Sequence, residues 1–141
     1  MASIDLRPLS LNDLELVLAW RSNPLVYRYF RGQDEPLDWE THLEWFSGRS
    51  RSREDFIIEY QGRRVGVISI DDNMITTVYI GEIKSQKKGI ASTALRQACN
   101  EVKYETFRAE VHRDNSSSIS LFESCGFEQI DVNGEWYIFE K

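Results

Sequence analysis

The chain has 141 residues, of which 41% are hydrophobic and 12% aromatic, and its formal net charge at pH 7 is −6. This length and composition predict one folded domain over residues 1–141 rather than a disordered chain. The acidic balance disfavours nucleic acid as a main partner. No apolar run approaches the ~20 residues of a membrane-spanning helix, so no membrane contact is expected.

The residues that bear on redox state, location and metals are few. Cys99 and Cys125 are too few for a disulfide framework, and we expect both to be small buried side chains. The N-terminal segment lacks the apolar centre of a signal peptide, so the expected location is cytoplasmic. No histidine and cysteine cluster has metal-ligand spacing, so no metal is expected. The basic segment at 48–54 is expected to be a solvated loop. Whether the protein forms a homodimer is left open.

The N-terminal part predicts one strand followed by helices. Alternating residues over 4–9 indicate the strand, and Ser10 is a typical N-cap for the helix that follows. That helix should end before Pro24, because a proline disfavours helical backbone in the preceding residue. A short helical piece is expected within 24–30, and Asp38 is expected to cap a further helix.

The rest of the chain predicts strands interrupted by two helices. The strand-like runs are residues 55–60, 65–70, 74–80, 107–112, 127–132 and 135–140, and the helical runs are 89–102 and 115–124. The dipeptide Asn133-Gly134 predicts a type I′ hairpin turn between the last two strands. This mixed order predicts an α+β fold, with one sheet covered by helices.

A short cationic turn precedes the predicted helix at 89–102, and it reads Gln86-Lys87-Lys88-Gly89-Ile90-Ala91. The first amides of a helix have no internal partner and carry the positive end of the helix dipole. Gly89 lacks a Cβ, so an anion can approach the backbone, and the lysines add positive charge. The turn is either a plain helix N-terminus or a seat for a pyrophosphate. Neither the P-loop nor the dinucleotide fingerprint is present.

This hexapeptide resembles the Q/R-x-x-G-x-G/A signature of the GNAT superfamily of acyl-CoA N-acyltransferases. A second segment, NSSSISLFESCGF at 115–127, is similar to the later N-x-x-S/A-x-x-L-Y/F-x-x-x-G-F segment of that family. The predicted element order also agrees, so the resemblance covers nearly the whole chain. It implies the GNAT fold, with a single mixed, mostly antiparallel sheet flanked by helices, and acetyl-CoA or a related acyl-CoA as cofactor.

The resemblance also implies where the cofactor lies. Its pyrophosphate would bind the amides of residues 86–91, and its pantetheine arm would run along the strand at 74–80. That strand is expected to splay from the strand at 107–112, which opens a cleft for both substrates. The implied cofactor-binding residues are Val78, Tyr79, Ile80, Gln86, Lys87, Lys88, Gly89, Ile90, Ala91, Asn115, Ser118 and Phe122.

Acetyl transfer to an amine requires a neutral amine, a hydrogen-bond donor for the developing oxyanion, and a proton for the leaving thiolate. Many family members have a tyrosine where this chain has Phe122, and phenylalanine has no proton to give. Ser118, Ser120, Ser124 or water are the alternatives for that role.

The general base is sought among the carboxylates near the expected cleft. Glu82, at the end of the strand at 74–80, is the first candidate and would act through water, although it can equally be a solvated loop carboxylate. Glu110 and His112 on the following strand are lesser candidates. The expected catalytic residues are therefore Glu82 and, for the thiolate, Ser124.

The residues expected to bind the acceptor amine, which we call the acceptor side, also resemble a segment of known family members. Residues 20–24, WRSNP, with Arg28, resemble a W-R-N-x-P…R stretch of two subgroups. One subgroup acetylates the N-termini of ribosomal proteins, and the other acetylates nucleotide-linked amino sugars. Aromatic side chains here can stack on a base or sugar, although core packing is the alternative. The implied acceptor residues are Arg21, Arg28, His42 and Trp45, whose charged members would meet a diphosphate.

The sequence thus predicts an N-acetyltransferase that moves an acetyl group from acetyl-CoA to a primary amine of a small molecule. Transfer would occur by direct attack in a ternary complex, and a nucleotide-linked amino sugar is the favoured acceptor. A ribosomal-protein or peptide N-terminal acetyltransferase and a non-catalytic acyl-CoA-binding module are the alternatives.

Overall fold

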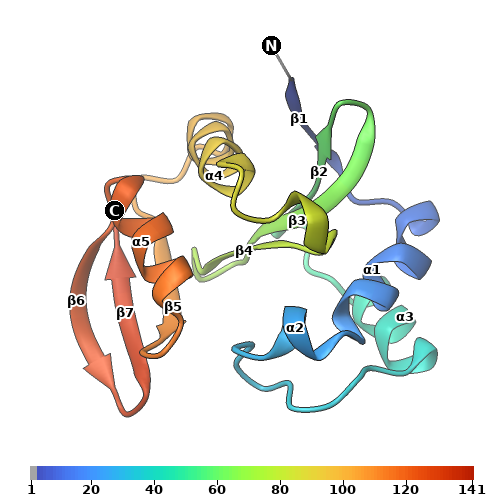
Figure 1. Cartoon of the computed structure of the whole chain (residues 1–141), viewed down its shortest axis with the longest axis horizontal. Helices are drawn as coiled ribbons and strands as arrows, with labels where there is room; N and C mark the ends of the chain where they lie inside the picture. Colours follow the sequence, from blue (N-terminus) through green and yellow to red (C-terminus); the bar gives the residue numbers. More distant parts are fainter. Residues whose placement is uncertain (1–2) are drawn as a thin grey trace.

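The computed structural model describes residues 3–141, and Figure 1 shows its elements. The strands are β1 (Ile4–Pro8), β2 (Glu54–Tyr60), β3 (Arg63–Ile70), β4 (Thr76–Ile80), β5 (Arg108–His112), β6 (Glu128–Asn133) and β7 (Trp136–Glu140). The helices are α1 (Leu14–Arg21), α2 (Pro24–Tyr27), α3 (Trp39–Ser47), α4 (Ile90–Glu101) and α5 (Ser116–Ser124), with 3-10 turns at Leu11–Asp13 and Ile83–Ser85.

The strands form two antiparallel sheets, β1-β2-β3-β4 and β5-β7-β6. The sheets meet at one parallel bridge between Ile75 and Arg108, where the Arg108 amide donates to the carbonyl of Met74 at 2.8 Å. Beyond this bridge β4 and β5 separate (Figure 1). The α+β class is confirmed, and the expected single sheet is present as two parts joined at this corner.

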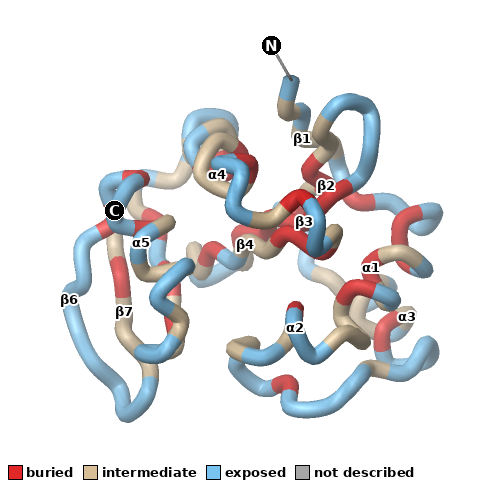
Figure 2. Tube along the Cα trace, viewed as in Figure 1, coloured by how far each residue is buried: buried red, intermediate tan, exposed pale blue. Residues whose placement is uncertain are grey.

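Helices cover both faces of the first sheet. Because neighbouring strand residues point to opposite faces, Ile58 and Ile68 join a core with α4, while Ile57 and Val67 join a second core with α1. Burial on both faces explains the nearly continuous apolar sequence of β3. Figure 2 shows the buried residues gathered in β2, β3 and β4 and on the sheet-facing side of α4, while β6 is exposed along its length.

Local capping fixes the helix starts that the sequence predicted. The Asp38 carboxylate accepts from the Thr41 amide at 2.8 Å, and the Asn115 side chain accepts from the Ser118 amide at 3.2 Å. Ser10 begins a 3-10 turn rather than α1 itself, and the two residues that close its capping box are Ser10 and Asp13. These caps satisfy backbone amides that the helices leave unpaired.

The two hairpins that have two-residue loops, β2–β3 and β6–β7, use different turns. Gln61 and Gly62, between β2 and β3, have φ angles of 52° and 77°, and two positive φ values are the mark of a type I′ turn. The prediction of a type I′ turn with Asn133 and Gly134 as its central residues is wrong. Asn133 is the last residue of β6 and pairs with Trp136, so Gly134 is the first central residue, and it alone has a positive φ, of 62°.

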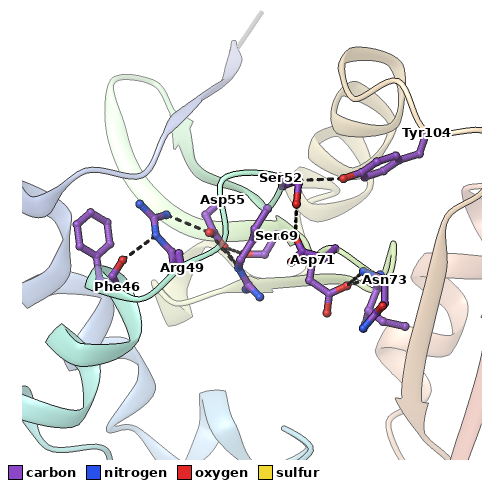
Figure 3. A network of polar contacts seen from close by, with 11 residues as sticks. Phe46, Arg49, Ser52, Asp55, Ser69, Asp71, Asn73 and Tyr104 are labelled. Atoms are coloured by element: carbon purple, nitrogen blue, oxygen red, sulfur yellow. Dashed lines mark hydrogen bonds and ion pairs between the residues drawn. The ribbon is translucent and has the colours of Figure 1, made fainter.

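The basic segment at 48–54 is largely exposed, as expected, but two of its side chains, Arg49 and Arg53, are anchored to a buried carboxylate. The side chain of Asp55 is fully buried, and it accepts from Arg49 and Arg53 at 3.0 Å and from the Ser69 hydroxyl at 2.6 Å (Figure 3). A buried carboxylate is costly unless it is paired in this way. The network therefore ties the loop after α3 to the centre of the first sheet.

The remaining sequence expectations concern cysteines, metals and membranes. Cys125 is buried and Cys99 is half-buried, and both are free thiols. Within residues 3–141, no cluster of three or more His, Cys, Asp or Glu side chains could hold a metal ion. In the same part of the chain, no helix has the length and apolar character needed to cross a bilayer.

Candidate active site

A cleft of about 1020 Å³ opens where β4 and β5 separate. One wall comes from α1, α2 and the residues that follow α2, and the floor comes from β4. The turn before α4, the end of β5 and the exposed side of α5 complete it. The cleft thus lies between segments that are far apart in the sequence and that the two sheets bring together.

The turn before α4 has the geometry of an anion seat. Gly89 has a φ of 78°, and a Cβ there would meet no atom within 4 Å, so the space above it is open. Within residues 3–141, the amides of Lys87, Lys88 and Gly89 donate no hydrogen bond. They precede a helix of 12 residues, whose N-terminal dipole adds to their attraction for an anion. The expected pyrophosphate seat therefore fits the observed backbone.

The side chains of this turn differ in their roles. Gln86 donates its Nε2 to the carbonyl of Ile80 at 3.0 Å, so it fastens the turn to the end of β4. Lys87 lines the cleft, whereas Lys88 is exposed outside it. Ile90 is buried beneath the turn and Ala91 is half-buried at its edge. The backbone, more than the side chains, makes the seat.

The strand β4 forms the floor of the cleft. Val78 and Ile80 pack into the core beneath α4, whereas Tyr79 points to the other face. There the Tyr79 ring lies edge-on to Trp20 at 6.4 Å and beside Phe30 at 5.2 Å. Burial raises the pKa of the Tyr79 phenol above its ordinary value, so this group is a neutral hydrogen-bond donor at physiological pH.

The helix α5 forms the opposite side. Asn115 caps it and lines the cleft, as does Ser118 one turn later. Phe122 is only 4% exposed, and its ring packs against Phe127 at 5.0 Å and Phe139 at 6.4 Å between centroids. Phe122 is therefore core as well as cleft wall, which gives its aromatic ring a packing role that needs no hydroxyl.

The two candidate carboxylates lie in different places. Glu82 is outside the cleft, where it accepts from the Ser85 hydroxyl and from Arg63 at 3.2 Å. The Ser85 hydrogen bond and, after it, Arg63 lower the pKa of Glu82, which makes it a weaker base. Glu110 on β5, by contrast, is the one acidic side chain among residues 3–141 that lines the cleft. Its carboxylate is 3.0 Å from the guanidinium of Arg31.

The other polar groups near β5 are already engaged. His112 accepts through Nδ1 from the Asp114 amide at 3.1 Å, and its Nε2 is 3.4 Å from the Glu135 carboxylate. With Nδ1 used as an acceptor, the ring has no free lone pair for a substrate proton. Ser124 lines the cleft, but its hydroxyl donates to the carbonyl of Leu121 at 2.8 Å.

Two arginines of the acceptor side face the cleft without an acidic partner. Arg21 donates from Nε at 3.2 Å and Nη2 at 2.8 Å to the side-chain oxygen of Gln33, which is neutral. Burial lowers the pKa of the Arg21 guanidinium. Arg28 lies over the ring of Tyr29, 4.9 Å from its centroid. Among the described residues, neither makes an ion pair, and both line the cleft together with Trp45.

His42 does not join them, which corrects its expected role in acceptor binding. It is 1% exposed, it is absent from the cleft wall, and neither of its ring nitrogens has a partner among the described residues. Its ring stacks on Trp45 with 5.7 Å between centroids and 9° between planes. Burial and then the charge of Arg21 lower the pKa of His42, so it is a neutral core residue.

No signal in the sequence pointed to three residues near this end of the cleft, of which Tyr29 and Arg31 line it and Trp136 is not part of its wall. Tyr29 stacks on His112 at 5.2 Å, and Arg31 contacts both Glu110 and the ring of Trp136. An arginine and a tryptophan after Arg28 are visible in the sequence, but no local pattern connects them with a glutamate on β5.

A cleft between splayed strands, with an anion seat at a helix N-terminus, is the arrangement of an acyl-CoA-dependent acetyltransferase. Comparison with known proteins agrees, because the acetyltransferase (GNAT) domain family model matches residues 3–128. The chain therefore belongs to the GNAT acetyltransferase family. The family, fold class, acyl-CoA cofactor and enzyme class that the sequence predicted are confirmed at this level.

Individual relatives extend this match. The chain is 37% identical over 139 residues to the uncharacterized protein MJ1062 of Methanocaldococcus jannaschii, which covers 91% of this chain but 28% of that protein. It is 27% identical over 140 residues to the putative phosphinothricin acetyltransferase YwnH of Bacillus subtilis, covering 90% of this chain and 82% of that protein. The crystal structure of a domain from M. jannaschii superposes with a TM-score of 0.89 and 32% identity, over 100% of this chain and 99% of that chain.

Proposed function

We propose that this protein is an N-acetyltransferase that moves an acetyl group from acetyl-CoA to a primary amine of a small molecule by direct attack in a ternary complex. The observation that carries the proposal is Glu110. It is the one acidic side chain that lines the cleft among the described residues, and it lies on β5, opposite the floor strand β4. A carboxylate in that place can take the proton that an amine must lose before or during attack.

Binding of the donor rests on the turn before α4 and on β4. The free amides of Lys87, Lys88 and Gly89 hold the pyrophosphate, and Lys87 adds a positive charge from the cleft wall. Val78, Tyr79 and Ile80 direct the pantetheine arm along β4, towards α5. Acetyl-CoA, when bound, supplies an activated thioester whose C–S bond breaks as the new C–N bond forms.

The residues around the thioester have separate tasks. Glu110 accepts the proton of the attacking amine directly or through water, in place of Glu82, which does not line the cleft. Ser118 is the hydroxyl that we assign to the leaving sulfur, because it lines the cleft and its Oγ makes no hydrogen bond to another described residue. Ser120 shares these properties but is exposed, whereas Ser118 is half-buried. Ser124 must first leave its bond with Leu121 to act in this way.

The acceptor that fits best is a nucleotide-linked amino sugar. Arg21 and Arg28 face the cleft without a carboxylate partner, and guanidinium groups match phosphoryl oxygens in charge and geometry. Tyr29 and Trp45 add aromatic surface for a base or a sugar face. An acceptor with a phosphoryl group near these arginines would carry its amine towards Glu110.

A non-catalytic acyl-CoA-binding module is the second candidate. One observation favours it, because Phe122 is packed into the core at the place where family members have a proton-donating tyrosine. Loss of that acid slows release of the thiolate, but CoA thiolate is a fair leaving group, so the packing of Phe122 does not exclude turnover.

A CoA-release assay with a panel of amines separates these functions. The panel contains UDP-linked amino sugars, phosphinothricin, amino acids, spermidine and short peptides, and acetyl-CoA binding is measured in parallel by calorimetry. Turnover that is fastest with the amino sugars supports the proposal. Binding of acetyl-CoA without turnover of any amine supports the module, and fastest turnover with peptides supports an N-terminal acetyltransferase. Absence of acetyl-CoA binding rejects all three.

A further inference from the structure

The guanidinium group of Arg31 lies beside Glu110, the candidate general base. The guanidinium of Arg31 is 3.0 Å from the Glu110 carboxylate and 5.3 Å from the centre of the Trp136 ring. Arg31 follows α2, whereas Glu110 is on β5 and Trp136 begins β7, and β5 and β7 are neighbours in the second sheet. The contact thus joins the acceptor wall of the cleft to the opposite sheet.

The partners of Arg31 have the chemistry of a site for an ammonium group. A carboxylate attracts the charge and accepts N–H hydrogen bonds, and the face of a tryptophan is the strongest aromatic surface for a cation. Neighbouring rings hold this surface in place. His112 meets Trp136 edge-on at 5.3 Å and 88°, and Tyr29 stacks on His112 at 5.2 Å. The site therefore exists before any ligand arrives.

The charge arrangement indicates that Arg31 is replaceable. Its side chain is 44% exposed and that of Glu110 is 33% exposed, and one N–O contact is recorded between them. Exposed ion pairs of this kind are weak, because water screens them and both side chains lose freedom. A ligand that brings its own ammonium group can therefore take the place of the guanidinium.

We infer that Glu110 and Trp136 form the binding site for the ammonium group of the acceptor, and that Arg31 fills this site when no acceptor is bound. The inference rests on the proposed function and deepens it, since it names the protonated primary amine as the form that enters. Arg31 then competes with the acceptor. Once the ammonium group lies on Glu110, the same carboxylate is in place to take its proton.

The first test is direct binding of a simple ammonium ion without acetyl-CoA. The probe is n-butylammonium chloride, with sodium chloride at equal concentration as the blank, followed by NMR of the backbone amides and the indole N–H of Trp136. Arg31→Ala should bind the probe about fivefold more tightly than the wild type, because it removes a competitor of the strength of an exposed ion pair. The signals of Glu110 and Trp136 should shift, and Trp136→Leu should weaken binding.

A matched control is available on the same strand. Arg108 pairs with Glu140 at 3.1 Å, and the two side chains are 45% and 34% exposed, almost the same as Arg31 and Glu110. Arg108 is not part of the cleft wall. Arg108→Ala should leave probe binding unchanged. Equal or weaker binding by Arg31→Ala, the same gain in Arg108→Ala, or shifts confined to other residues would overturn the inference.

The second test separates this inference from the proposed function. With whichever amine turns over in the CoA-release assay, Arg31→Ala should lower KM about fivefold and leave kcat nearly unchanged, since only a competitor is removed. A raised KM shows that Arg31 helps to bind the acceptor and rejects the inference. Normal ammonium binding in a protein without turnover leaves the ammonium site standing and rejects the proposed activity.

Discussion

Gly81 and Trp20 are in direct contact, and a β-carbon on Gly81 would overlap the indole ring. Gly81 follows β4, where its amide donates to the Val65 carbonyl at 2.8 Å, and Trp20 is the buried penultimate residue of α1. The missing side chain lets α1 lie against the end of β4. Because Arg21 comes next in α1, this contact also fixes where that arginine enters the cleft.

Gly81→Ala should therefore destabilise the protein by ~1–3 kcal/mol, the usual cost of forcing a methyl group into a packed site. Urea denaturation followed by circular dichroism measures the change. Gly48→Ala is the comparison. Gly48 has a φ of −93°, and its added Cβ would make a tight contact of 3.3 Å with the Glu44 carbonyl oxygen rather than an overlap, so this variant should lose less stability than Gly81→Ala. Equal stability of the Gly81→Ala protein and the wild type would contradict the packing described here.

Removal of the candidate base should slow the reaction. Glu110→Gln keeps the size of the side chain but cannot accept the amine proton, so kcat/KM should fall by about 10²–10⁴-fold at neutral pH. Acetyl-CoA affinity, measured by calorimetry, should stay at the wild-type value. Glu82→Gln is the comparison, and it should lose little activity because Glu82 is held outside the cleft by Ser85 and Arg63. A large loss of activity in Glu82→Gln alone would show that Glu82, not Glu110, is the general base.

Phe122→Tyr tests the position of the leaving sulfur. The ring is packed against Phe127 and Phe139 but also lines the cleft, so in the proposed binding mode a hydroxyl added there would face the thioester. Activity should equal or exceed that of the wild type in the CoA-release assay, because the new hydroxyl can protonate the thiolate. A large fall in kcat, with an unchanged circular dichroism spectrum, would show that α5 is not aligned with the sulfur as proposed.

His42 should make stability depend on pH in a narrow window. Its pKa in the folded protein is lowered by burial and by Arg21, so between that pKa and the ordinary value near 6.5 the unfolded state binds more protons. Stability from this group is therefore full above pH ~6.5 and is lost as the pH falls through the folded pKa. His42→Phe keeps a ring against Trp45 and removes the titration.

Thermal denaturation at pH 7.5 and pH 5.0 measures the effect. The Tm of the wild type should fall more between the two values than the Tm of His42→Phe. The buried Asp13 does not disturb this window, because its hydrogen bond with Arg7 lowers the pKa of its carboxyl far below pH 5. An equal fall of Tm in both proteins would show that His42 does not titrate there.

Local sequence patterns predicted the features that depend on a few neighbouring residues. The caps Asp38 and Asn115 need only the amides that follow them, and the anion seat needs only Gly89 and the start of α4. The strand pattern located β3 for the same reason, since its apolar residues are consecutive. The residues that cause each of these features lie within one turn or one strand.

The features that local patterns could not supply depend on partners far along the chain. Arg31 and Glu110 are 79 positions apart, so the cation at the base could not be found from either segment alone. Glu82 and Glu110 look equivalent as carboxylates beside strands, and only the folded chain shows that Arg63 pairs with Glu82, 19 positions away. His42 has the spacing of a core residue as well as that of a ligand contact, and the packing of α3 decides between them.

The bridge between Ile75 and Arg108 is the point where the backbones of the two sheets are joined. Past that point, the sheets depend on side-chain contacts across the gap. A molecule that spans the gap touches both sheets at once, and its binding energy adds to the cohesion between them. The two sheets also share one buried core, which includes Ile58 and Ile68 of the first sheet and Ala109 and Phe139 of the second. A ligand that fills the opening would therefore raise the free energy of unfolding of the whole domain.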